Sequence, residues 1–210
     1  MILDGEAQFS FDGRTSLLKG PAGAPDRLGH SHTVYNPTDK PVQWMNFNVG
    51  TIKGYYDTFN LDDSRIGVPM DAVPTFISWH LDRSLLKPVD HMNGGNGTVQ
   101  YRSVLDPSVF YTTWSYLDDL FIPPGSSVGP VTDPDMSEVY CVLTGDGSVT
   151  VGSETAPIHT GDAIAVRLGE THSLTSSGTA PMEFLIFGIA RDMDAKRAMM
   201  VRPAPGRRNR

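Results

Sequence analysis

The sequence predicts an all-β protein, and three observations support that fold class. Glycine (21 residues) and proline (16 residues) are frequent although no stretch is of low complexity, which favours many turns and short strands. Residues 139–144 alternate along a run of β-forming side chains, and the flexible turn Gly145-Asp-Gly147 follows them. Several short patterns also recur at one constant spacing, which indicates a repeated unit. Rolled into a small antiparallel barrel, such strands bring residues far apart in the sequence into one interior.

Composition limits the class of protein and its partners. Hydrophobic content of 39% and charged content of 20% are ordinary for a globular chain, so wholesale disorder is not expected. The net charge of −7, with basic residues clustered at 207–210, argues against a nucleic-acid-binding face. The single cysteine, Cys141, excludes a disulfide within the chain. We find no signal-peptide-like segment at Met1 and no apolar run of about 18 residues. We therefore expect a cytoplasmic protein without a membrane partner.

The repeat has a spacing of 140 residues and indicates an internal duplication. Its strongest element is a six-residue pattern, Arg-Leu-Gly-x-x-His, which is long enough to make a chance match improbable. The matched pairs are Leu3-x-Gly5 with Leu143-x-Gly145, Arg27-Leu28-Gly29-x-x-His32 with Arg167-Leu168-Gly169-x-x-His172, and Pro41-x-x-Trp44 with Pro181-x-x-Phe184.

The duplication predicts one partial and one complete barrel. The expected divisions are a partial N-terminal barrel (1–50), a connecting segment with one or two strands (51–110), a complete C-terminal barrel (111–190), and a short helix with a basic tail (191–210). The first copy begins at Met1, the equivalent of Cys141, so we expect it to lack its opening strands. The connecting segment, a second subunit or residues upstream of Met1 are three open sources for the missing part. Because an incomplete barrel exposes strand edges, we expect a homodimer.

These residues resemble the cupin superfamily, and the duplication resembles a bicupin. The family's first motif is G-x5-H-x-H-x3,4-E-x6-G, and its second is G-x5-P-x-G-x2-H-x3-N. The matching positions are Gly125, Glu138 and Gly145 for the first motif, Gly161, Gly169 and His172 for the second, and Gly29, His32 and Asn36 for the second motif of the N-terminal copy. The resemblance implies a jelly-roll-like double-stranded β-helix and covers most of the chain except the connecting segment.

For chemistry, the resemblance implies a divalent-metal site that this sequence only partly retains. Metal-binding cupins use the two first-motif histidines, the glutamate and the second-motif histidine. Val131 and Asp133 stand at the two first-motif histidine positions, and valine cannot bind a metal. The implied ligand set is Asp133, Glu138 and His172, holding Fe, Mn, Zn or Ni, with a metal-free barrel as the alternative. Asp135 is a substitute for Asp133 if the loop shifts.

Other candidate residues allow two interpretations each. Arg167 stands where the family has proline, and it is either a surface residue at a strand end or an anion clamp for a carboxylate substrate. Tyr140 is a candidate for contacting substrate, although aromatic residues in such strands are more often plain core. The pair His30 and His32 is a minor metal hypothesis, because side chains two apart share a strand face.

Two functions follow. The first is a small-molecule enzyme with isomerase, cyclase, lyase or dioxygenase chemistry, in which Glu138 and His172 bind a metal or act as acid and base. The second is a non-catalytic, metal-free cupin that binds a small ligand or a partner protein. The fold alone does not name a substrate.

Overall fold

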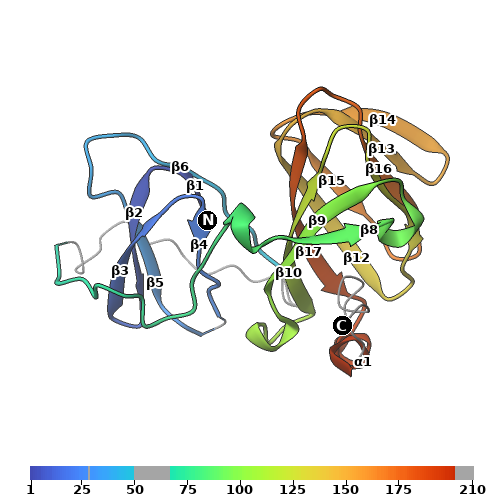
Figure 1. The fold of residues 1–210 in the computed structure, drawn as a ribbon. Coiled ribbons are helices and arrows are strands. Elements are labelled where there is room, and N and C mark those ends of the chain that lie inside the picture. Colours follow the sequence, from blue (N-terminus) through green and yellow to red (C-terminus); the bar gives the residue numbers. More distant parts are fainter. Residues whose placement is uncertain (28, 50–66, 202–210) are drawn as a thin grey trace. The chain divides into compact units, whose positions relative to one another are not determined.

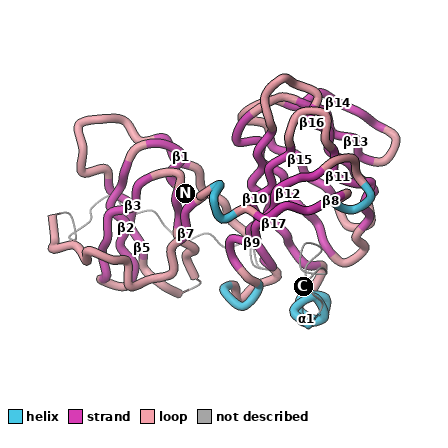
Figure 2. The backbone as a smooth tube through the Cα atoms, viewed as in Figure 1, coloured by secondary structure: helices cyan, strands magenta, loops and turns pink. Residues whose placement is uncertain are grey.

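Strands make up nearly all the regular structure of the computed structural model, which describes residues 1–27, 29–49 and 67–201 (Figure 2). Within these residues there is one α-helix, α1 (Met193–Val201), and three short 3-10 turns, η1 (Arg83–Leu85), η2 (Met92–Gly94) and η3 (Pro107–Val109). The prediction of an all-β protein is therefore confirmed. No helix in the described part of the chain has both the length and the apolar character needed to cross a membrane.

The chain forms two compact units, an N-terminal unit (Met1–Leu81) and a C-terminal unit (Asp82–Arg210). Two sheets build the C-terminal unit (Figure 1). The larger sheet has the order β15 (Ala163–Val166), β12 (Met136–Thr144), β17 (Met182–Ala190), β10 (Trp114–Ile122), β9 (Thr98–Leu105) and β8 (Lys87–Asp90). The smaller has the order β11 (Ser127–Thr132), β16 (Thr171–Ser176), β13 (Gly147–Val151) and β14 (Glu154–Ile158).

Alternating side chains from both sheets meet in one core. Leu120 and Ile122 on β10 and Phe184 on β17 are 1% exposed or less, and Leu174 on β16 reaches the same cluster from the smaller sheet. Burying each such side chain contributes about 1.5–3 kcal/mol. Because strand residues two apart share a face, the core residues also fix which neighbours point inward. On β10 these inward positions include Tyr116 and Asp118.

The predicted turn after β12 is present and needs its glycine. Gly145 has φ of 87°, a backbone conformation that side chains with a Cβ rarely adopt. A methyl group at Gly145 would also lie 2.4 Å from the carbonyl oxygen of Pro181. This tight reversal takes the chain from β12 in the larger sheet to β13 in the smaller one, so that both sheets contribute to the barrel that holds Glu138.

The N-terminal unit also has two small sheets. One has the order β6 (Gln43–Trp44), β1 (Ile2–Asp4), β4 (Ala22–Gly23) and β7 (Trp79–His80). The other has the order β3 (Arg14–Lys19), β2 (Glu6–Phe11) and β5 (His32–Tyr35). Ile2, Ala7 and Phe9 are buried between them and form the centre of a separate core.

Strand pairing in the N-terminal unit repeats that of the C-terminal unit at a spacing of 140 residues. Ile2 pairs with Trp44 and Asp4 with Gln43, and 140 residues later Val142 pairs with Phe184 and Thr144 with Glu183. Both ladders shift register at this point, so even the irregularity is repeated.

The other sheet repeats in the same way. Ala7 pairs with Leu18 as Gly147 pairs with Ile158. The described strands therefore follow the offset that the sequence indicates. The description of the whole chain as a bicupin stays a prediction.

The expected connecting segment, 51–110, supplies strands to both units. Residues 51–66 of it lie outside the described part of the chain. Strand β7 pairs with β4 in the N-terminal unit, and β8 and β9 extend the larger sheet of the C-terminal unit. Strand β7 thus extends the N-terminal sheet beside β4, and which part completes the partial barrel stays a prediction. The division at residues 50, 110 and 190 stays a prediction.

Candidate functional site

Two sheets of the C-terminal unit bring Glu138, Tyr140 and His172 together. Glu138 and Tyr140 lie two residues apart on β12 and share its inner face. His172 comes from β16 of the opposing sheet, and its ring centroid lies 5.3 Å from that of Tyr140. The side chain of His172 is 3% exposed and that of Glu138 is 16% exposed. The pair that the sequence predicted to face one interior therefore does so.

A hydrogen-bond chain connects these side chains. Tyr140 donates from its hydroxyl to Oε2 of Glu138 at 2.8 Å, and the same hydroxyl lies 2.7 Å from Nε2 of His172. Tyr116 donates to the other carboxylate oxygen, Oε1, at 2.5 Å. Nε2 of His172 and Oε2 of Glu138 are 3.4 Å apart. Both carboxylate oxygens and one imidazole nitrogen therefore have tyrosine hydroxyls as partners.

The network determines which groups carry protons. Burial, reinforced by the nearby charge of Glu138, raises the pKa of Tyr116 and of Tyr140 well above the usual value, so both phenols stay protonated. Tyr140 has one proton and gives it to Glu138, so its oxygen must accept the bond from His172. Nε2 of His172 therefore carries a proton. Nδ1 is buried without a hydrogen-bond partner among the described residues.

Gly188 allows Tyr116 to reach Glu138 across an intervening strand. On β17 it pairs with Tyr116 on one side and with Glu138 on the other. A methyl group at this position would lie 2.1 Å from Cζ of Tyr116. The tyrosine ring therefore lies over the bare backbone of β17, and any residue larger than glycine would displace it.

A second inward-facing carboxylate belongs to the same interior. Asp118 is 6% exposed and accepts a hydrogen bond from the hydroxyl of Tyr101 at 2.5 Å. Its charge contributes to the raised pKa of Tyr116 and of Tyr140, after burial and Glu138. The sequence interpretation missed Asp118. The signal was available, because Asp118 has the same parity along the strand as Leu120 and Ile122, and a carboxylate there must face the core.

The side chain of Asp133, the third candidate ligand, forms hydrogen bonds within its own loop. Its Oδ1 accepts from the backbone amides of Asp135 at 2.8 Å and Met136 at 3.1 Å. No group of three or more His, Cys, Asp or Glu side chains within the described residues is arranged to hold a metal ion. Val131 pairs directly with His172 across β11 and β16, so an apolar side chain stands beside the histidine. The donor set at Glu138 and His172 thus does not fit a resident metal.

Arg167 lies away from the network. It is exposed in the turn after β15, where its amide donates to the carboxylate of Glu170 at 2.7 Å. Val166, the residue before it, is buried and pairs with Glu138. Because successive strand residues point to opposite faces, Arg167 is expected on the outer side. The role of Arg167 as an anion clamp stays a prediction.

Comparisons with known proteins point to one family. A family model described as "Cupin domain" matches residues 120–188, which include both Glu138 and His172. An oxalate-binding protein of Thermotoga maritima is 31% identical over 97 residues, which are 46% of this chain and 80% of that protein. The crystal structure of a predicted oxalate decarboxylase from Thermotoga maritima has 29% identity and a TM-score of 0.50, covering 52% of this chain and 96% of the other. A Cupin 2 conserved barrel domain protein of Salinispora arenicola has 16% identity and a TM-score of 0.45, covering 62% and 96% respectively.

Proposed function

Because the chain belongs to the cupin superfamily, we propose that its C-terminal unit binds a small molecule through the hydrogen-bond network of Glu138, Tyr140 and His172. The observation that carries this proposal is that the polar atoms of the network already have hydrogen-bond partners within the protein. Tyrosine hydroxyls take the carboxylate oxygens of Glu138 and the imidazole nitrogen of His172, which are the atoms that a cupin metal would need. The site therefore works with hydrogen bonds and protons.

The charges in this interior favour one class of ligand. Glu138 and Asp118 both accept hydrogen bonds from tyrosines, as carboxylates do. Two anionic groups in a poorly solvated interior repel a further anion, at a cost of about 4 kcal/mol for unit charges 4 Å apart at an intermediate dielectric. The preferred ligand is thus a small, oxygen-rich molecule that supplies hydroxyl donors. A dianion such as oxalate, the ligand in the relative's name, would meet this repulsion.

The same residues support a second candidate function, acid–base catalysis on the bound molecule. His172 donates through Nε2 to the oxygen of Tyr140, while Tyr140 donates its own proton to Glu138. When Nδ1 of His172, which has no partner among the described residues, takes a proton from the bound molecule, Nε2 passes its own proton to the oxygen of Tyr140, and the Tyr140 proton moves to the carboxylate of Glu138. Such a relay suits isomerisation or elimination at a carbon next to an oxygen-bearing group.

A matched set of two-carbon ligands tests the binding proposal. Oxalate, glycolate and ethylene glycol differ by one negative charge at each step and have similar size. NMR titration of chelator-treated protein should detect binding in the order ethylene glycol and glycolate above oxalate. Glu138→Gln removes one anionic group and should raise the relative affinity for oxalate. Glu154→Gln, an exposed glutamate on β14, is the control and should change nothing.

Two results would overturn the proposal. One is tightest binding of oxalate to the wild-type protein, and the other is binding of any probe only after Mn²⁺ has been added. For the catalytic alternative, Glu138→Gln should lose turnover, because an amide cannot take up the relayed proton. Retained turnover in that variant would eliminate the relay.

A further inference from the structure

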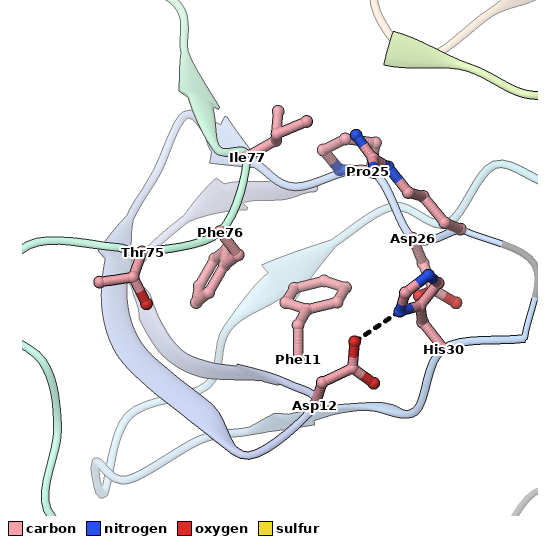
Figure 3. A pocket seen from close by; sticks show the side chains of 9 residues that line it. Phe11, Asp12, Pro25, Asp26, His30, Thr75, Phe76 and Ile77 are labelled. Carbon is pink, nitrogen blue, oxygen red and sulfur yellow. Dashed lines mark hydrogen bonds and ion pairs between the residues drawn. The ribbon is translucent and has the colours of Figure 1, made fainter.

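The N-terminal unit contains a pocket that shares no residue with the Glu138 network. Its volume is about 240 Å³. Figure 3 shows the side chains that line it. Three segments line it: the end of β2 with the following turn, the loop between β4 and β5, and the segment 75–77. The lining residues are Phe11, Asp12, Pro25, Asp26, Arg27, His30, Thr75, Phe76 and Ile77. All belong to one compact unit, so the pocket is complete within it.

The floor of this pocket is apolar, and its aromatic rings pack on one another and on the core of the unit. The rings of Phe11 and Phe76 lie 4.8 Å apart at 49°, and His32 stacks on Phe11 at 5.9 Å. Phe11 and Phe76 both pack against the buried core of the N-terminal unit. Pro25 and Ile77 extend the apolar surface (Figure 3). A ligand with a flat or branched apolar body would therefore find a fixed surface to contact.

The rim carries two aspartate–histidine pairs. Asp12 Oδ2 lies 2.5 Å from Nδ1 of His30, and Asp26 Oδ2 lies 2.7 Å from Nδ1 of His32. With neutral imidazoles, each Nδ1 donates to its carboxylate and the aspartates keep their negative charge. Among the described residues of the lining, Arg27 is the one permanent cation. Carboxylates thus outnumber guanidinium groups by two to one.

The internal repeat shows what is distinctive about these residues. Phe11 and Asp26 stand 140 positions before Val151 and Val166. In the C-terminal unit, Val166 is buried in the barrel core and Val151 packs against it. At the corresponding places the N-terminal unit has a large ring and a carboxylate with a 33% exposed side chain. The positions that form a closed core in the C-terminal unit therefore line an accessible pocket in the N-terminal unit.

We propose that this pocket binds a small organic amine, with the ammonium group at the aspartates and the apolar body on Phe11 and Phe76. Two carboxylates close to an apolar surface favour a cation over a neutral molecule, and a neutral molecule over an anion. The carboxylates are 53% and 33% exposed for Asp12 and Asp26, so a ligand can reach them without displacing core residues. The expected affinity is modest, because exposed ion pairs are weak.

Benzylammonium, benzyl alcohol and benzoate test the proposal, because they share one apolar ring and are positive, neutral and negative respectively. The full chain is titrated with each probe and followed by NMR at neutral pH. We expect benzylammonium to bind most tightly and benzoate least tightly, with shifted signals at Phe76 and Ile77. Asp26→Asn should weaken benzylammonium binding about fivefold and leave benzyl alcohol unchanged. Asp39→Asn, an exposed aspartate outside the pocket, is the matched control and should have no effect.

Tightest binding of benzoate would overturn the proposal, and so would equal binding of benzyl alcohol and benzylammonium. The absence of any shift of the pocket signals, with probe at up to about 10-fold excess over about 1 mM protein, would overturn it as well. Signals shifted instead around Glu138 and His172 would also contradict it, because they would assign the amine to the other unit.

Discussion

The two units pair their strands alike but bury different side chains. The buried polar residues described in the N-terminal unit, Gln8, Ser10, Thr15 and Ser16, are all neutral. Those of the C-terminal unit include five ionisable residues: Asp118, Asp119, His172, Glu183 and Lys196. Asp118 and Asp119 lie on β10, which has no counterpart at the 140-residue spacing. Glu183 and His172 lie on strands whose pairing is repeated in the N-terminal unit, so for these two the backbone register does not create the difference.

Two equivalent histidines illustrate the point. His32 and His172 end the same six-residue pattern and lie on equivalent strands, β5 and β16. The side chain of His172 is 3% exposed and bonded to Tyr140, whereas that of His32 is 46% exposed and paired with Asp26. A buried ionisable group must have polar partners nearby, because burial without them is costly. The C-terminal unit supplies those partners as tyrosines, and the N-terminal unit leaves its charges near solvent.

Replacing Gly188 should have the largest effect on this arrangement. Gly188→Ala places a methyl 2.1 Å from Cζ of Tyr116, so the tyrosine must leave Glu138. We expect a loss of about 3 kcal/mol in the free energy of unfolding, measured by urea denaturation. Combining it with Tyr116→Ala removes the clash, and the two losses should then be less than additive. Strict additivity would contradict the proposed placement of the ring. The equivalent residue of the N-terminal unit is Asn48, so no such crossing is expected there.

Lys196 should have the next largest effect. Its Nζ donates to the carbonyl oxygens of Phe110, Thr112 and Trp114 at 2.6, 2.7 and 2.8 Å, which holds α1 against that loop. Lys196→Met leaves these carbonyls without their donor and should cost about 2 kcal/mol. Hydrogen exchange should show faster exchange in α1 alone. The exposed neighbour Arg197→Met is the control, and an equal effect there would remove the special role of Lys196.

Asp119 should make the stability of the C-terminal unit depend on pH. Burial, reinforced by Glu183 and opposed by Arg102 and Arg83, raises the pKa of Asp119 from 3.8 to about 7. Between these values the folded state holds the proton more tightly than the unfolded state, so the free energy of unfolding falls as pH rises.

Asp119→Asn should therefore stabilise the protein more at pH 8 than at pH 5, by at least about 1.4 kcal/mol, the equivalent of one pKa unit. Chemical denaturation at both pH values measures this difference. Asp146→Asn, at an exposed aspartate, should show no such change between the two pH values. A benefit that is larger at pH 5 would contradict the assignment.

An exposed ion pair of the N-terminal unit should have the smallest effect. Arg14 contacts Asp71 through two hydrogen bonds, at 3.0 and 2.8 Å, but the arginine side chain is 57% exposed. Asp71→Asn should change the free energy of unfolding by less than about 0.5 kcal/mol, and raising the salt concentration should reduce even that. A loss as large as that of Lys196→Met would show that charges in the two units do not differ as described.

The sequence predicted much of the fold because its signals are local. Alternation along 139–144, the turn at Gly145 and the 140-residue repeat each reflect strand geometry, and strands β12 and β13 and the repeated registers follow from them. Motif spacing also indicated that Glu138 and His172 share an interior. These features need no knowledge of distant contacts.

The rest of the site depends on contacts across sheets. Tyr116 reaches Glu138 only because Gly188, on a third strand, has no side chain, and no spacing rule relates these three positions. Asp133 belonged to the expected ligand set from its motif position, but two backbone amides of its own loop occupy its Oδ1. Local turn chemistry of this kind competes with ligand roles and is hard to see in a motif.

The ¹⁵N imidazole spectrum of His172, recorded with and without one equivalent of Mn²⁺, tests the central claim most directly. The hydrogen-bond chain through Tyr140 requires a proton on Nε2. We predict a protonated Nε2 and no selective broadening of the His172 signals by the paramagnetic ion, with His172→Gln supplying the assignment. An Nε2 without a proton, or His172 signals lost at one equivalent of Mn²⁺, would contradict a hydrogen-bonded site and indicate a metal centre.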